Sequence, residues 1–272
     1  MPQAVALYGQ DLELIGIPFA LVAVFVFVLG LCIGSFLNVV IYRLPAKLNI
    51  AKGRSFCPSC GAPIKGYDNI PLISYLVLRG RCRHCKAHIS LVYPAVELLT
   101  GVLFLLLFVL YGLSFLSLGF ALYIPCIVAS AFIDAKTKEI PNSLIVAMLV
   151  FGVIHAVLNF NGPVLWWERL IGIAAGGLPL LVAYIVSRGG MGGADIKLMA
   201  AAGLFLGWKL VLVALVTGIV AGAIGVLILA AMKKAGRKTA VPFAPYLAIG
   251  IIVSIFAGDM IVKWYVALLG LT

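Results

Sequence analysis

Long apolar runs constrain this chain more than any other feature. Hydrophobic residues make up 64% of its 272 residues and charged residues only 11%, which is more apolar surface than a soluble domain of this size can bury. A helix needs about 20 apolar residues to cross a bilayer. We therefore predict an all-α polytopic membrane protein with about eight transmembrane helices. The apolar runs are residues 17–41, 91–111, 115–133, 142–160, 168–187, 195–208, 210–232 and 243–262.

The basic residues between these runs indicate the orientation. If the N-terminus lies outside, nearly all Lys and Arg fall on the cytoplasmic side, as the positive-inside rule requires. The first run follows Asp11 and Glu13 and lacks a small-residue cleavage site, so we expect it to be a retained helix. The net charge of +11 needs no nucleic acid to explain it, because orientation and contact with anionic membrane lipids suffice. The cytoplasmic segments in this topology are residues 42–90, 134–142, 188–197 and 233–238.

One sizeable polar segment interrupts the apolar chain. Residues 42–92 contain Cys57, Cys60, Cys82 and Cys85 as two C-x2-C pairs separated by 21 residues, close to the spacing of zinc ribbons. Four thiolates give Zn²⁺ a closed tetrahedral site that serves structure. Two disulfides are the alternative, although a reducing cytoplasm disfavours them. We expect this zinc domain to follow an outer N-terminus and first helix (1–41) and to precede the membrane core (93–272).

Two acids stand at boundaries of the apolar runs. Asp134 ends the third run and Asp195 opens the sixth, beside the glycine-dense residues 189–194. A solvated end residue and a helix cap are the simple interpretations. If the two carboxyl groups meet, they share one proton, and the pair can then activate water and polarise a peptide carbonyl as aspartic proteases do. The glycines would then hold an extended peptide beside them, or form a flexible connector.

Other polar residues lie inside or at the ends of the predicted helices. Ser35, Asn38 and Tyr42 share one helical stripe, which we expect to face neighbouring helices. Arg43 is expected to extend to the lipid head groups. Glu97 lies about one turn inside the membrane, so we expect it to be functional or paired with a basic residue.

Several of these motifs occur together in the same order in a known family. The chain resembles the type IV prepilin leader peptidases of the bifunctional kind, which are intramembrane aspartic proteases. The resemblance departs at Ala194, where the family's Gly-x-Gly-Asp signature has its second glycine. The matching motifs are Gly34-Ser35-Phe36-Leu37-Asn38-Val39, Tyr42-Arg43-Leu44-Pro45, the four cysteines, Tyr93-Pro94 with Glu97, Asp134 with Thr137, Ile140 and Pro141, and Met191-Gly192-Gly193-Ala194-Asp195-Ile196-Lys197.

The resemblance implies a bacterial inner-membrane enzyme with its active site at the cytoplasmic face. Such an enzyme cleaves leaders from type IV prepilins or pseudopilins after a glycine, with Asp134 and Asp195 as catalytic residues. It also methylates the new N-terminal residue with S-adenosylmethionine, although no glycine-rich cofactor loop is found in the sequence. The segment Gly192, Gly193, Ala194 and Lys197 is the candidate substrate-binding segment.

Two rival functions stay open from the sequence. One is a broader intramembrane aspartic protease that cuts signal-peptide remnants and lacks methyltransferase activity. The other is a zinc-stabilised, non-enzymatic membrane scaffold or transporter. The sequence does not indicate an oligomeric state.

Overall fold

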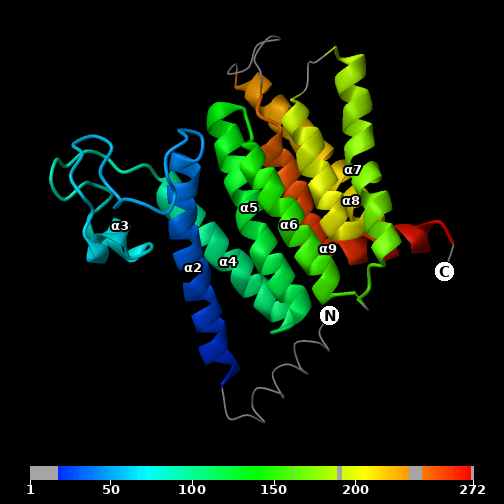
Figure 1. Ribbon diagram of the computed structural model, residues 1–272, viewed down its shortest axis with the longest axis horizontal. Helices are drawn as coiled ribbons and strands as arrows, with labels where there is room; N and C mark the ends of the chain where they lie inside the picture. The colour runs from blue at the N-terminus through cyan, green and yellow to red at the C-terminus, as the bar shows by residue number, and fades with distance from the viewer. Residues whose placement is uncertain (1–17, 161, 189–191, 233–240, 271–272) are drawn as a thin grey trace. The chain divides into compact units, whose positions relative to one another are not determined.

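The computed structural model describes residues 18–160, 162–188, 192–232 and 241–270, and the described part is built from helices (Figure 1). Six helices are long and apolar enough to cross a membrane, whereas α6 is shorter, with 17 residues. Within the described ranges, extended backbone pairing is limited to two isolated β-bridges. The all-α membrane prediction is therefore confirmed. The six long helices are α2 (Phe19–Arg43), α4 (Val92–Tyr111), α5 (Phe115–Thr137), α7 (Trp166–Val186), α8 (Gly193–Ala231) and α9 (Ala244–Leu268), and the shorter α6 is Asn142–Leu158.

The chain divides into two compact units, Met1–Ser117 and Leu118–Thr272. In the first unit α2 packs against α4, and glycines allow the close approach: a Cβ added to Gly30 would lie 2.8 Å from the Cα of Gly101. The Asn38 side-chain amide donates to the Tyr93 carbonyl at 3.1 Å. Asn38 therefore faces a neighbouring helix, as its place on the polar stripe predicts.

The segment between α2 and α4 carries the cysteines and two short helices, η1 (Gly66–Asn69) and α3 (Ile73–Val77). Arg43, at the end of α2, is only 6% exposed, so its predicted extension to the lipid head groups is wrong. Its guanidinium instead donates to the carbonyl oxygens of the loop that follows. A guanidinium has five N–H donors in a planar fork, which suits it to gather several acceptors. The acceptors are the carbonyls of Asn49, Lys52, Gly53 and Arg54, at 3.0, 2.7, 3.3 and 3.0 Å.

In the second unit α8 is the helix on which α6, α7 and α9 pack. The closest approach is between α7 and α8, where a Cβ on Gly203 would overlap the backbone of Gly172. Gly172 and Gly176 form a small-xxx-small pair on α7, a motif that permits close packing in membranes. This pair was missed in the sequence, although its spacing could have revealed it.

Helix α8 is broken at Gly207, whose backbone (φ 78°, ψ 172°) is not helical. The sequence shows two apolar runs here, 195–208 and 210–232, separated by Lys209, and the structure has one helix that is interrupted two residues before it. Carbonyls just before a break lose their helical donors. The buried Arg169 of α7 donates to one of them, the Phe205 oxygen, at 2.9 Å.

Candidate active site and metal centre

Asp134 lies in the last turn of α5 and is buried, with 5% of its surface exposed. The chain turns directly after it: the Lys138 amide donates to the Asp134 carbonyl at 2.8 Å, and the Thr137 hydroxyl bonds to the carbonyls of Ile133 and Glu139. A solvated end residue, the simple interpretation of Asp134, is therefore excluded.

Asp195 lies in the first turn of α8 and is also 5% exposed. Its amide donates to the carbonyl of Gly192, the residue that precedes the helix, at 3.2 Å. A helix N-terminus favours a carboxylate because its unpaired N–H groups carry positive partial charge. The local geometry thus explains why an acid is tolerated at this apolar boundary.

An aromatic contact sets the two acids at matching depth. Tyr123 of α5 stacks on Phe205 of α8, with ring centroids 4.0 Å apart. Asp134 follows Tyr123 by 11 residues and Asp195 precedes Phe205 by 10, which are rises of about 16 and 15 Å along the two helices. Both acids therefore lie at similar heights in the second unit, and their carboxyl groups are close enough for their charges to interact.

A third helix contributes a backbone donor to this pair. The amide of Ala244, the first residue of α9, donates to Asp134 Oδ2 at 3.1 Å. Reasoning from the sequence missed this contact, which joins residues 110 positions apart. The available signal was Pro245, because proline is favoured in the first turn of a helix and marks its start.

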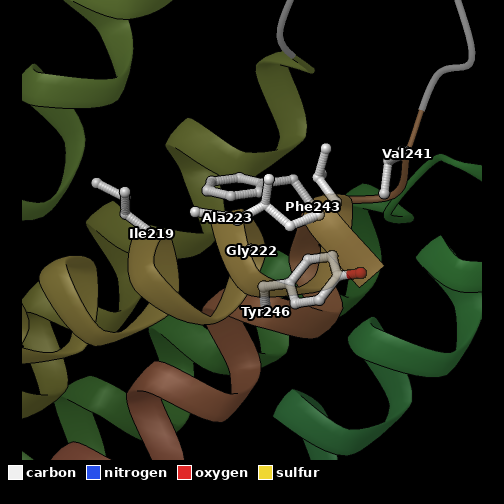
Figure 2. Close-up of a pocket in the computed structure, with 8 residues that line it drawn as sticks. Ile219, Gly222, Ala223, Val241, Phe243 and Tyr246 are labelled. Atoms are coloured by element: carbon white, nitrogen blue, oxygen red, sulfur yellow. The ribbon is translucent and has the colours of Figure 1, made fainter. Parts of the chain in front are cut away.

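An apolar groove with a cavity volume of about 550 Å³ begins one residue from Ala244 (Figure 2). Its walls come from the second half of α8 and the start of α9, with the rings of Phe243 and Tyr246 beside Gly222 and Ala223. Ile219, Val226, Leu227 and Val241 complete the lining. The groove offers an apolar side chain or helix a place beside the acid pair.

The predicted substrate-binding segment begins α8. Residues 189–191 of the glycine-dense stretch lie outside the described residues. A Cβ on Gly193 would meet nothing within 4 Å, and one on Gly192 would meet only Asp195 Oδ2, at 3.4 Å. Ala194 is half-buried, and the Lys197 ammonium donates to Asn142 Oδ1 at 3.1 Å. No packing contact in the described chain therefore requires Gly193 to lack a side chain.

The four cysteines of the first unit come together. Their Sγ atoms all lie within 4.8 Å of one another, and Cys57 and Cys85 Sγ are 3.9 Å apart. A tetrahedral zinc with Zn–S bonds of about 2.3 Å requires sulfur atoms about 3.8 Å apart. All four thiols are free, so the disulfide alternative finds no support. Cys57, Cys60, Cys82 and Cys85 can therefore bind zinc.

Each cysteine pair is held by the same backbone turn. The Cys57 amide donates to the Ala62 carbonyl, and the Cys82 amide donates to the Ala87 carbonyl, both at 2.9 Å. Gly61 and Lys86, each directly after the second cysteine of its pair, both have positive φ. The backbone N–H groups of Ser59 and Cys60 lower the pKa of Cys57 to about 7 by hydrogen bonding to its sulfur. The hydrogen bonds of the first turn therefore favour the thiolate form of Cys57, which is the form that binds a metal.

Glu97 ties the cysteine-bearing segment to α4. Its Oε2 accepts the Leu72 amide at 2.9 Å, and the Ser35 side chain of α2 lies near the carboxylate. The hydrogen-bond donor is therefore a backbone amide, not the basic residue that was one of the two expectations. Glu97 joins α2, α4 and the start of α3.

Comparison with known proteins identifies the family of this chain. Residues 28–111 match the family model of the bacterial peptidase A24 N-terminal domain, and residues 120–227 match that of the type IV leader peptidase family. A prepilin leader peptidase/N-methyltransferase of Aeromonas salmonicida (strain A449) is 35% identical over 89% of this chain and 93% of the relative.

Two further relatives carry the same name. The protein of Myxococcus xanthus (strain DK1622) is 40% identical over 80% of this chain and 67% of the relative. That of Bacillus subtilis (strain 168) is 33% identical over 88% and 96%. No solved structure matches the chain. The matches cover both units, and the chain is a multi-pass membrane enzyme that belongs to the type IV leader peptidase family.

Proposed function

We propose that the chain removes the leader peptide of type IV prepilins or pseudopilins, with Asp134 and Asp195 as the catalytic pair. The single observation that carries this proposal is the burial of both acids at matching depth in one unit. The charge distribution supports a place for the pair at the cytoplasmic face of the inner membrane.

The two carboxyl groups have different surroundings, which suggests different roles. Asp134 accepts the Ala244 amide, and such a hydrogen bond favours the ionised carboxylate. Among the described residues the Asp195 carboxylate accepts no hydrogen bond, and the N-terminus of α8 offers it only a partial positive charge, so we assign the shared proton to Asp195. Asp134 then takes a proton from water while Asp195 donates one to the carbonyl oxygen. When the tetrahedral intermediate, a gem-diol, collapses, the C–N bond breaks and Asp134 gives its proton to the leaving amine. Asp195 recovers its proton from one of the two hydroxyl groups, which becomes the carbonyl oxygen of the product.

The segment Gly192, Gly193, Ala194 and Lys197 is the proposed binding site for the peptide around the scissile bond. Gly193 is exposed and unobstructed, so an extended peptide backbone can approach it closely. Packing within the chain does not explain why residue 193 is glycine, whereas close approach of a substrate backbone would. By the family resemblance, the cut follows a glycine of the substrate.

The apolar groove is the proposed site for the hydrophobic part of the substrate. Prepilins of this family carry an apolar helix after the leader, which can enter sideways from the lipid while the basic leader stays in the cytoplasm. Phe243 and Tyr246 line the groove, and Phe243 directly precedes the residue that contacts Asp134 (Figure 2). Leader and mature segments would then diverge at the acid pair.

N-methylation of the new N-terminus with S-adenosylmethionine is proposed from the names of the relatives. The residues that hold this cofactor stay unassigned. Zinc on the four cysteines is proposed to be structural, because four thiolates leave no coordination position for water. Its chemical contribution is to cross-link the two cysteine turns.

Incubation of the purified protein with a prepilin and labelled S-adenosylmethionine, followed by mass determination of the product's N-terminus, tests both activities. Asp134→Asn and Asp195→Asn should each lower cleavage by roughly 10²–10⁴-fold. Asp259→Asn is the matched control, because this acid of α9 is exposed. Persistent cleavage in both variants would exclude the pair.

The position of the cut separates the rival functions. A cut within the apolar helix would favour the broader intramembrane protease, and a correct cut without label transfer would limit the enzyme to proteolysis. If no condition yields a cut, the scaffold or transporter interpretation gains support.

A further inference from the structure

The cysteine-bearing segment exposes an apolar ridge on its short helix α3. The ridge is formed by Ile73, Leu76 and Val77, whose side chains are 58%, 72% and 69% exposed. Their spacing of i, i+3 and i+4 places them on one face of the helix. Large exposed apolar side chains gathered in one patch mark a site of contact with a partner or a membrane.

A basic hollow adjoins this ridge and shares Val77 with it. It has a cavity volume of about 550 Å³ and is also lined by Arg79, Arg81, Arg83 and Lys86, with Leu78 and Cys82. Arg83 is paired with Asp68 at 2.6 Å and holds the pKa of that carboxyl below its usual value. Within the part of the chain that the structure describes, Arg79, Arg81 and Lys86 have no acidic partner and are exposed.

The position of α3 is fixed relative to the membrane-spanning helix α4. Leu72, directly before α3, donates its amide to Glu97 Oε2 at 2.9 Å. Glu97 lies five residues after the start of α4, a rise of about 7–8 Å, whereas the head-group region of one leaflet is about 5–7 Å thick. The contact therefore holds the ridge at the level of the membrane interface.

The net positive charge of the cysteine-bearing segment determines which kind of surface it can bind. Residues 43–91 contain nine Lys and Arg residues and one acid, Asp68. The cytoplasmic segments predicted for residues 118–272 are also basic, and two of their three acids, Asp134 and Asp195, are buried. An anionic lipid surface complements this charge, whereas the second unit of the chain does not.

We propose that the α3 ridge and the basic hollow form a docking surface for anionic phospholipid. Ile73, Leu76 and Val77 enter the boundary between head groups and acyl chains, and Arg79, Arg81 and Lys86 contact lipid phosphates. Apolar burial and charge attraction act together in such interfacial contacts. The docking fixes the orientation of the cysteine cluster on the leaflet, and it does not depend on the proposed peptidase activity.

The test uses the full chain in lipid nanodiscs with the photoreactive residue benzoylphenylalanine in place of Leu76. Cross-linked products are identified by mass spectrometry in discs of phosphatidylcholine alone and in discs with phosphatidylglycerol. We expect phospholipid adducts that increase with phosphatidylglycerol and decrease with salt. The variant Arg79→Gln/Arg81→Gln/Lys86→Gln should lose most of the adduct, since each basic residue near an anionic surface contributes roughly fivefold to binding.

The matched control is Lys47→Gln/Lys52→Gln/Arg54→Gln, which removes the same charge from exposed residues elsewhere in the segment. It should retain most of the adduct. Adducts with residues 118–272 in place of lipid, or equal lipid adducts in both discs and in both triple variants, would overturn the proposal. Zinc content, measured in every variant, verifies that the segment remains folded.

Discussion

Arg43 organises the loop that leads into the first cysteine pair, and its replacement gives a quantitative test of this fold. Arg43→Met keeps the length and the apolar character of the side-chain stem but removes the donors. Of the four hydrogen bonds to loop carbonyls, three are 3.0 Å or shorter. At about 1.5 kcal/mol each for a charged donor, these three contribute roughly 4–5 kcal/mol.

In the variant, water can hydrogen-bond to the released carbonyls, and this offsets part of the lost free energy. Residues 51–54 are exposed, so we expect a net loss of about 2–3 kcal/mol in the free energy of opening this loop. A loss of this size makes opening roughly 30- to 150-fold more frequent. Because Lys52 and Arg54 are trypsin sites within the loop, the rate of tryptic cleavage after them in detergent measures the opening.

Two further variants distinguish the planar geometry of the Arg43 guanidinium from its positive charge. Arg43→Lys keeps the charge but not the planar guanidinium. Its rate of tryptic cleavage should lie between that of Arg43→Met and that of the unchanged protein. Lys47→Met removes an exposed basic residue of the same loop and should leave the rate unchanged. Equal cleavage rates in Arg43→Met and the unchanged protein would refute the role assigned to the guanidinium.

Three other variants test the packing, the groove and the metal centre. Gly203→Leu should lower the melting temperature and the rate of prepilin cleavage, because the new side chain overlaps the Gly172 backbone and overpacking costs about 1–3 kcal/mol. The control Gly193→Ala places a methyl group in open space and should leave the melting temperature unchanged. Ala223→Phe should raise the KM for prepilin with little change in thermal unfolding, since Ala223 is an exposed groove residue; an unchanged KM would remove the groove from the substrate path. Cys82→Ser should lower bound zinc, measured by metal analysis, and make residues 57–85 sensitive to protease while the helical circular dichroism persists; full zinc retention would contradict the four-thiolate site.

The local features of this fold could be predicted from the sequence. Apolar length located the helices, because membrane thickness sets a minimum span. The division between the runs 195–208 and 210–232 fell at Lys209, two residues after the break at Gly207. Spacing alone indicated the convergence of the four cysteines, because C-x2-C pairs form self-contained turns. The two acids were found because charge is costly beside lipid.

Contacts between distant segments could not be predicted in this way. The bond from Leu72 to Glu97 and that from Ala244 to Asp134 use backbone amides, which every residue other than proline possesses. Arg43 was wrongly assigned to the head groups because its partners are also backbone atoms, with no side-chain signature. Periodicity describes which face of a helix is apolar but not which neighbour meets it.

The donor to Asp134 belongs to the main chain, so ordinary mutation cannot delete it. Nearly every substitution at position 244 keeps the N–H group, and only proline would eliminate it. The hydrogen bond to Asp134 thus depends on the residue at which α9 begins and not on the side chain at that position. A one-residue insertion or deletion in the preceding connection would shift that starting point and misplace the donor, although it would alter no residue of the acid pair.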